Sequence, residues 1–210
     1  HGARPQITSA LSAKSITCEY HNQVRITESA AVAEISGAVG AVSTKIEALF
    51  SLSLKPSPMA GSNIRVCRGN FVTAKPYGIH QGVDHHFTGK VRKIHSSAIQ
   101  QQLDNGNIVM LSNLGYSLTG EVFNLTAEEV ATQAAISLKA DKLILLTPTD
   151  GILDSNGELV PSLSEKDTID QLDRFAKDES TDSICLSKAL QAALLAYQSG
   201  VHRSHLISYR

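Results

Sequence analysis

The sequence has no tryptophan, few aromatic residues and almost no net charge. Aromatic residues make up 5% of the 210 residues, and 19 basic residues nearly balance 20 acidic ones, for a formal net charge of -1. Proteins that bind nucleic acid or anionic membranes by electrostatic attraction need an excess of lysine and arginine. The composition therefore gives no reason to expect either partner, and it favours small ligands and protein contacts.

Long hydrophobic runs are also missing. No run reaches the roughly 18 apolar residues that a helix needs to cross a bilayer, and no leader of charged, apolar and then small residues opens the sequence. Hydrophobic residues still make up 42% of the chain, which is enough for one sizeable core. We therefore expect a single domain over residues 1–210, without a membrane anchor.

Cysteine is scarce. Cys18, Cys67 and Cys185 are odd in number, far apart and free of any C-x-x-C pair. This excludes a disulfide framework and a four-cysteine zinc site, and it predicts reduced thiols in the core. A cytoplasmic location follows as an expectation.

The apolar residues that are present predict several helices. Between residues 29 and 54 they recur at spacings of three and four, which is typical of a long amphipathic helix, and Pro56 and Pro58 end it. Pro5 is suited to the first turn of a short helix that reaches about Lys14. Further helices are predicted over 96–105, 127–139 and 186–197, the last one capped by Gly200. The polar segment 177–182 is predicted to be a mobile loop.

Strands are predicted between these helices. Residues 63–95 alternate in polarity with Gly and Pro between the runs, which indicates short antiparallel hairpins. Strands at 108–111, 121–123, 142–146 and 204–209 then alternate with helices, which is typical of an α/β fold with a mainly parallel sheet. Residues 143–146 are apolar throughout, so this strand is expected to be central and covered on both faces.

Three candidate motifs do not match the functional sites that they resemble. Gly89-Lys90 lacks the glycine that a Walker loop places five positions earlier, and residues 115–120 are one residue too long for a nucleophile elbow. Histidines and Asp84 cluster between residues 80 and 95, but His85 and His86 are adjacent in a strand and would point to opposite faces. We expect these histidines to be solvated on hairpins, and we expect no metal site.

Five stretches, in this order along the chain, resemble the amino-acid kinase superfamily: HGARPQI at 1–7, VRIT at 24–27, NLTAE at 124–128, LSKA at 186–189 and VHRSHLI at 201–207. The likeness covers nearly the whole chain and is closest to acetylglutamate kinase and the kinase-like domain of N-acetylglutamate synthases. It implies a three-layer αβα sandwich with a mainly parallel central sheet and a small β-hairpin region.

The resemblance also assigns a ligand pocket to Gly2, Arg4, Arg25 and Asn124. In the kinases a glycine-rich turn lets backbone N–H groups approach the transferred phosphoryl group. Here Gly2 keeps that turn, but Ala3 and Arg4 replace residues that are usually glycine. Arg25 matches the arginine that binds the substrate carboxylate, as guanidinium forks do well, and Asn124 matches a substrate contact. An ordinary surface salt bridge is the alternative reading of Arg25.

The catalytic positions of the kinases are altered. Glu128 stands where they have an aspartate, but the favoured reading is an ordinary carboxylate in the first turn of a helix. Lys188 matches one of two catalytic lysines and is otherwise a solvated or capping lysine. The first strand, which carries the other lysine, is expected to be missing, as is a carboxy-terminal acetyltransferase domain. We therefore predict no catalytic residue and no cofactor in this domain.

The resemblance implies regulation rather than catalysis. His205 matches a histidine that helps to bind inhibitory L-arginine, although a strand histidine can also be a satisfied core residue. The full enzyme would transfer an acetyl group from acetyl-CoA to glutamate, the first step of arginine biosynthesis, and would form a homo-oligomer. The alternatives are a working acetylglutamate kinase, which uses ATP and magnesium, and a pure assembly platform with the 29–54 helix between subunits.

Overall fold

The structure, a computed structural model, describes residues 1–52, 64–154, 157–176, 178 and 180–209. The chain forms two compact units, His1–Val130 and Ala131–Arg210. Helix α4 (Ala127–Ser137) begins in the first unit and ends in the second. The expectation of one domain over residues 1–210 stays a prediction.

Three helices of the first unit confirm the predicted ones: α1 (Arg4–Ala13), α2 (Ser29–Phe50) and α3 (Ser96–Asp104). The apolar spacing explains how α1 and α2 pack. Ile7 and Leu11 lie one turn apart on α1, and they form a buried cluster with Ile35 and Val39 of α2. Helix α2 ends at Phe50, earlier than predicted, and the two proline positions lie outside the described residues.

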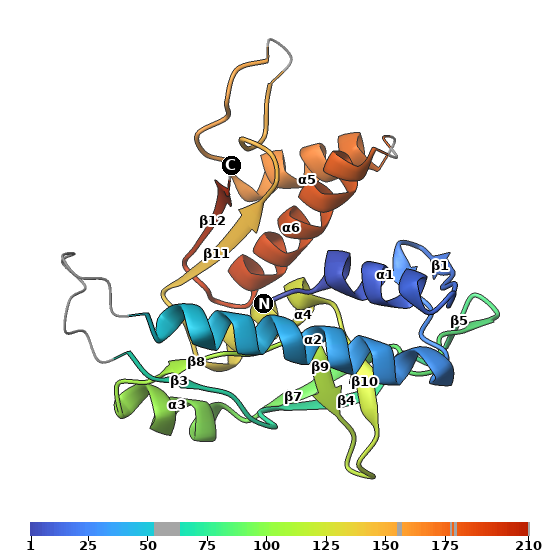
Figure 1. The fold of residues 1–210 in the computed structure, drawn as a ribbon. Coiled ribbons are helices and arrows are strands. Elements are labelled where there is room, and N and C mark those ends of the chain that lie inside the picture. The colour runs from blue at the N-terminus through green and yellow to red at the C-terminus, as the bar shows by residue number, and fades with distance from the viewer. Residues whose placement is uncertain (53–63, 155–156, 177, 179, 210) are drawn as a thin grey trace. The chain divides into compact units, whose positions relative to one another are not determined.

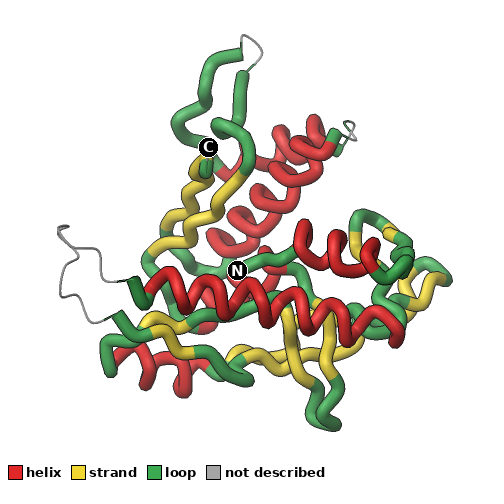
Figure 2. The backbone as a smooth tube through the Cα atoms, in the orientation of Figure 1, coloured by secondary structure: helices red, strands yellow, loops and turns green. Residues whose placement is uncertain are grey.

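The strands of the first unit form one larger sheet and several pairs (Figure 2). The sheet has the order β10 (Val122–Asn124), β9 (Leu114–Tyr116), β4 (Val72–Pro76), β7 (Gly89–Ile94). The pairs β10–β9 and β4–β7 are antiparallel, whereas β4–β9 is parallel. The antiparallel pairing predicted within residues 63–95 is confirmed for β4 with β7, but it is wrong for residues 66–67, which pair in parallel with residues 108–109, and β9 was not predicted.

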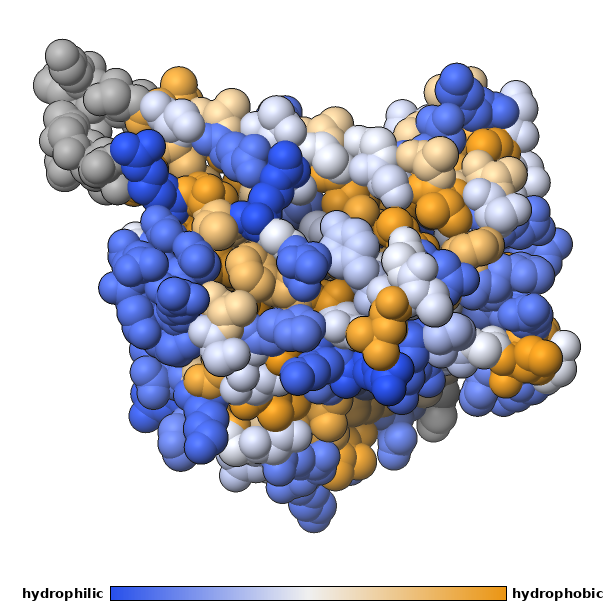
Figure 3. All heavy atoms as spheres, turned by 90° about the horizontal axis from the view of Figure 1, so that it is seen from below, coloured by the Kyte–Doolittle hydropathy of each residue, from blue (hydrophilic) through white to orange (hydrophobic). Residues whose placement is uncertain are grey.

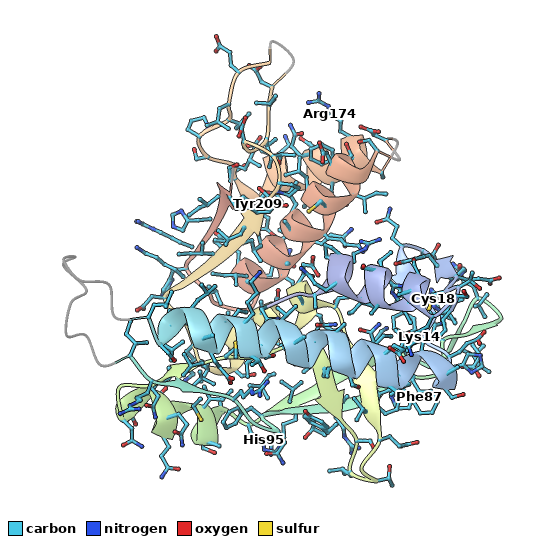
Figure 4. The ribbon with its side chains drawn as sticks, viewed as in Figure 1. Lys14, Cys18, Phe87, His95, Arg174 and Tyr209 are labelled. Atoms are coloured by element: carbon cyan, nitrogen blue, oxygen red, sulfur yellow. The ribbon has the colours of Figure 1, made fainter. Side chains whose placement is uncertain are left out.

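Two short hairpins and one parallel pair complete the first unit. The hairpins are β1 (Tyr20–His21) with β2 (Val24–Arg25), and β5 (Ile79–His80) with β6 (Val83–Asp84). The parallel pair is β3 (Val66–Cys67) with β8 (Ile108–Val109). The free thiol of Cys18 packs against the α1–α2 cluster, as expected for a reduced core thiol (Figure 4).

Glu129 of α4 protects the outer edge of β7. Its Oε1 accepts a hydrogen bond of 2.9 Å from the backbone N–H of Val91, next to a bulge in the β4–β7 pairing. Burial raises the pKa of the Glu129 carboxyl, and the Val91 bond and the charges of Lys90 and Lys75 oppose the rise only in part. The Glu129 carboxylate therefore accepts a hydrogen bond from a backbone N–H at the sheet edge, but it loses part of its contact with water.

The variant Glu129→Gln tests whether burial raises the pKa of Glu129 despite the hydrogen bond from Val91. A raised pKa in the folded state means that Glu129 contributes stability below its ordinary pKa and loses that contribution as the pH rises through the folded value. Glutamine keeps the acceptor for Val91 but does not titrate. We expect the free energy of unfolding of the parent protein to rise relative to that of the variant between pH 7 and pH 4, measured by urea denaturation. Parallel pH profiles would contradict it.

Over its described residues, the second unit combines a parallel strand pair with the end of α4 and two further helices (Figure 1). Strand β11 (Lys142–Thr147) pairs with β12 (Arg203–Ser208) in parallel, as predicted. Helix α6 (Thr181–Gln198) starts well before residue 186, because Ser180 caps it by accepting from the N–H of Ser183. Helix α5 (Glu165–Phe175), which has a Ser164–Asp167 capping box, was not predicted.

The expectation that residues 143–146 are covered on both faces is wrong for the described chain. Leu143 and Leu145 are buried with Ala189 and Ala192 of α6, whereas Ile144 is 55% exposed and Leu146 65% exposed. Helices pack on only one face of the pair, so the alternate side chains remain uncovered.

No helix in the described ranges is both long enough and apolar enough to span a bilayer. On the face of the molecule shown in Figure 3, hydrophobic residues are scattered among hydrophilic ones.

Candidate functional site

The predicted pocket residues of the first unit gather where chain segments meet at the start of α1. The backbone nitrogen of His1 donates to the carbonyl of Leu111 at 2.6 Å. A Cβ atom placed on Gly2 would lie 3.2 Å from the Cβ of Ala127, the first residue of α4. Gly2 is thus the residue that lets the turn approach α4 closely, as the sequence suggested.

A buried polar network runs beside this turn. The Asn124 side chain accepts from Asn113 Nδ2 at 3.0 Å and donates to Thr27 Oγ1 at 3.1 Å. Thr88 Oγ1 donates to the carbonyl of Arg25, and it lies at hydrogen-bond distance, 3.0 Å, from the hydroxyl oxygen of Thr27. Asn124 is therefore fixed by its neighbours, and it links the end of β10 to the backbone of β2.

One acceptor of this network has no donor among the described residues. Asn113 is 5% exposed, and its Oδ1 atom is buried without a hydrogen-bond partner in that part of the chain. A buried acceptor without a donor costs free energy that a water molecule or a ligand N–H group recovers.

Two guanidinium groups share one tyrosine ring next to this network. The Cζ atom of Arg25 lies 4.9 Å from the ring centroid of Tyr20, and that of Arg4 lies 5.3 Å from the same centroid. Tyr20 and Arg25 are register partners across the β1–β2 hairpin. The ring face attracts both cations, which holds them near each other despite their like charge.

A chain of hydrogen bonds ties this pair to α1. Arg25 Nη2 donates to Thr8 Oγ1 at 2.9 Å, and that hydroxyl donates to the carbonyl of Arg4 at 3.0 Å. Neither arginine forms an ion pair within the described ranges. The surface salt bridge considered for Arg25 is therefore not found, and two held cations without a carboxylate partner suit an anionic ligand.

The remaining predicted residues do not all join this group. Glu128 lies in the first turn of α4, as expected for a carboxylate that interacts with the start of a helix. Lys188 is half-buried on α6, and His205 is exposed on β12, so both belong to the second unit. The reading of His205 as a satisfied core histidine is wrong.

The histidines between residues 80 and 95 differ from expectation at two positions. His80 and His86 are exposed as predicted, but His85 is completely buried, with 0% exposure, and His95 is half-buried after β7, with its Nε2 bonded to Thr73 Oγ1 at 2.8 Å. The adjacent side chains of His85 and His86 do point to opposite faces, and burial falls on the side that meets Tyr77, whose ring centroid is 4.4 Å away. Over the described residues, no three His, Cys, Asp or Glu side chains are placed to hold a metal ion.

A cavity of about 490 Å³ lies elsewhere in the first unit. Residues of α2 and of the segments before β4 and β9 line it, among them Ser43, Asn70 and Ser112. None of the predicted pocket residues lines this cavity, so it is not the pocket that the sequence indicated.

Sequence reasoning missed Thr8, Tyr20, Thr27 and Asn113. The sequence could have indicated Tyr20, because it lies five residues before Arg25 on the other side of a short turn. It could not have indicated Asn113, because the role of Asn113 depends on a contact with Asn124 across two strands.

Comparison with known proteins gives one consistent family. The sequence matches the amino acid kinase family over residues 1–208. It is 46% identical over 209 residues to the amino-acid acetyltransferase of Pseudomonas putida (strain GB-1), a match that covers 100% of this chain and 47% of that protein. The chain thus spans about half the length of the curated relatives it matches.

Comparison with solved structures agrees with the sequence match. N-acetylglutamate synthase from Neisseria gonorrhoeae, complexed with coenzyme A and L-arginine, superposes with a TM-score of 0.85 at 32% identity, over 99% of this chain and 47% of that one. Carbamate kinase from Giardia superposes with a TM-score of 0.59 at 13% identity, over 99% of this chain and 75% of that one, which shows a shared fold alone. From its mixed α/β architecture and this sequence match, the chain belongs to the amino acid kinase family.

Proposed function

We propose that this chain is the kinase-like, arginine-responsive part of an N-acetylglutamate synthase, an enzyme that makes N-acetylglutamate from acetyl-CoA and glutamate. The observation that carries the proposal is the match of the whole chain, at 46% identity, to 47% of an amino-acid acetyltransferase. The acetyl-transfer site then belongs to the part of those relatives that this chain does not match.

The phosphoryl-transfer alternative is disfavoured by the turn at the start of α1. Arg4 replaces a residue that is usually glycine in the kinases, and its guanidinium lies over Tyr20 in the anion-binding group described above. Glu128 replaces an aspartate with a side chain one methylene longer. Neither change suits a cradle of backbone N–H groups around a phosphoryl group.

The same residues support an anion pocket. Arg4 and Arg25 supply positive charge. Gly2 lets the turn approach α4 closely, and the side chain of Asn124 is held in place by its hydrogen bond to Thr27. We assign to it the carboxylate of a small amino-acid ligand, because planar guanidinium groups match carboxylates well.

Regulation and assembly follow from the same proposal. L-arginine acts as the inhibitor and contacts His205, whose exposed position on β12 leaves its ring accessible. The protein forms a homo-oligomer in the cytoplasm.

The proposal predicts the activities of the full-length protein. Acetyl transfer from acetyl-CoA to glutamate should occur and should be inhibited by L-arginine, and isothermal titration should detect arginine binding at or below millimolar concentration. ADP release that depends on N-acetylglutamate and ATP should be absent. Arginine binding without acetyl transfer would identify a different arginine-responsive protein, and ADP release would establish the kinase instead.

A further inference from the structure

The cavity of about 490 Å³ in the first unit is separate from the anion pocket. Helix α2 packs against β10 and forms one side of the cavity (Figure 1), and residues within 68–72 and 110–116 form most of the other side. Sites for small organic ligands commonly enclose about 300–1,000 Å³. The cavity is therefore large enough for a free amino acid.

One face of α2 lines the cavity. Ser36, Gly40 and Ser43 follow one another at spacings of four and three residues, which places them on the same side of the helix. A Cβ atom placed on Gly40 would meet no atom within 4 Å. Glycine thus keeps this part of the cavity open, and a larger side chain at residue 40 would project into it.

Most of the other lining side chains are apolar. They come from β4, β9, β10 and the segment before β9, and they are Val72, Met110, Leu111, Leu114, Tyr116 and Val122. Apolar surface gains free energy when it moves from water to such surroundings. The cavity therefore suits a ligand with an apolar body.

A pair of opposite charges lies at the carboxy-terminal end of the α2 face. Arg68 lines the cavity, and its Nε lies 2.9 Å from Oε1 of Glu47, which is one turn beyond Ser43 on α2. The two side chains are 45% and 30% exposed. A guanidinium carries five N–H donors and a carboxylate two acceptor oxygens, so this contact leaves groups of both charges for a ligand.

We propose that this cavity binds a free α-amino acid with a large apolar side chain, such as L-phenylalanine. The ligand carboxylate accepts from Arg68, its ammonium donates to Glu47, and its side chain lies among the apolar residues. Glu47 repels a ligand that is only anionic, and Arg68 repels one that is only cationic, so the pair favours a zwitterion.

The charges distinguish this cavity from the anion pocket. Arg4 and Arg25 lie against one tyrosine ring, and neither forms an ion pair with a carboxylate in the described part of the chain. Arg68 has such a partner in Glu47. The inference goes beyond the proposed function and does not depend on it.

Isothermal titration of the full-length protein with L-phenylalanine tests the site. Saturable binding is expected at or below millimolar concentration. Phenylpropionate lacks the ammonium and phenethylamine lacks the carboxylate, so each should bind at least about tenfold more weakly, because one charged group of the pair then has no ligand partner. L-alanine should also bind at least about tenfold more weakly, because it lacks the ring.

Two results of these titrations would overturn the proposal. The first is the absence of saturable L-phenylalanine binding. The second is equal affinity for L-phenylalanine and phenylpropionate, because the pair of charges would then not select a zwitterion.

Two glycine variants place the ligand in the cavity. Gly40→Leu should abolish L-phenylalanine binding, because the new side chain fills the space. Gly37→Leu should keep it, because Gly37 is exposed, does not line the cavity and also has no atom within 4 Å of an added Cβ. Leucine is a better helix former than glycine, so both variants should fold. Full binding in Gly40→Leu, or equal loss in both variants, would contradict the proposal.

Two arginine variants separate the cavity from the anion pocket. Arg68→Gln should weaken L-phenylalanine binding at least about tenfold, whereas Arg25→Gln should leave it unchanged. The reverse pattern would place the amino acid in the anion pocket and overturn the proposal, while acetyl transfer and its inhibition by L-arginine test the proposed function separately. Sedimentation gives a last check. A change of oligomer size in Gly40→Leu, together with no amino-acid binding by the parent protein, would assign the cavity to a contact between copies and would also overturn the proposal.

Discussion

Gly89→Ala is expected to destabilise the first unit strongly. A Cβ atom placed on Gly89 would lie 2.7 Å from the Cβ of Phe123, 2.9 Å from the carbonyl oxygen of Lys75 and 3.0 Å from Leu125 Cδ2. The carbonyl belongs to β4, the sheet partner of β7, so it cannot move without breaking the pairing. Overpacking of a fixed site costs about 1–3 kcal/mol, and contact with backbone places this one at the upper end.

The matched control is Gly37→Ala on α2. A Cβ at Gly37 meets nothing within 4 Å, and alanine in a helix is about 0.8–1 kcal/mol more favourable than glycine. Urea denaturation should therefore give shifts of opposite sign for the two glycine-to-alanine changes. A Gly89→Ala protein as stable as its parent would show that β4 and β7 do not approach this closely.

Local patterns predicted most helices, because each depends on spacing within one segment. Ile35 and Val39 fall on the face of α2 that is buried, and α1 begins at Arg4 with Pro5 in its first turn. Helix α5 was missed although Ser164 and Asp167 form a capping box and Ile169, Leu172 and Phe175 recur every three residues, so its sequence did carry a helical signal.

Sheet contacts were predicted less well, because they depend on partners distant in sequence. The uniform apolarity of residues 143–146 indicated burial on both faces, yet Ile144 and Leu146 are exposed while Leu143 and Leu145 pack on α6. His85 shows the converse error. Its polar neighbours suggested solvation, but Tyr77 and His21 cover it from other segments.

The pocket residues were predicted by motif, and the structure adds the contacts around them. The resemblance selected Gly2, Arg4, Arg25 and Asn124, and all four lie in the first unit. It could not show that both arginines lie against the ring of Tyr20 or that Thr8 links them, since Tyr20 and Thr8 lie outside the matching stretches.

His205→Ala is expected to weaken inhibition by L-arginine in the full-length protein. The side chain is exposed on β12, and its register partner on β11 is Ile144, so its removal should leave the strand pair intact. Couplings between an effector and an active site are commonly about 1–3 kcal/mol, or 5- to 150-fold. We expect the arginine concentration for half-inhibition to rise at least about tenfold, measured from acetyl transfer at fixed glutamate and acetyl-CoA.

His202→Ala provides the comparison, because His202 is also exposed and lies just before β12. It should leave the half-inhibitory concentration unchanged, and both variants should unfold within about 0.5 kcal/mol of the parent, as surface substitutions usually do. Isothermal titration then separates two causes. Weaker arginine binding in His205→Ala places this ring in the effector site, because an inhibitor acts only through its preference for one state of the enzyme. Equal arginine affinity and equal inhibition in His205→Ala and the parent would remove His205 from that site.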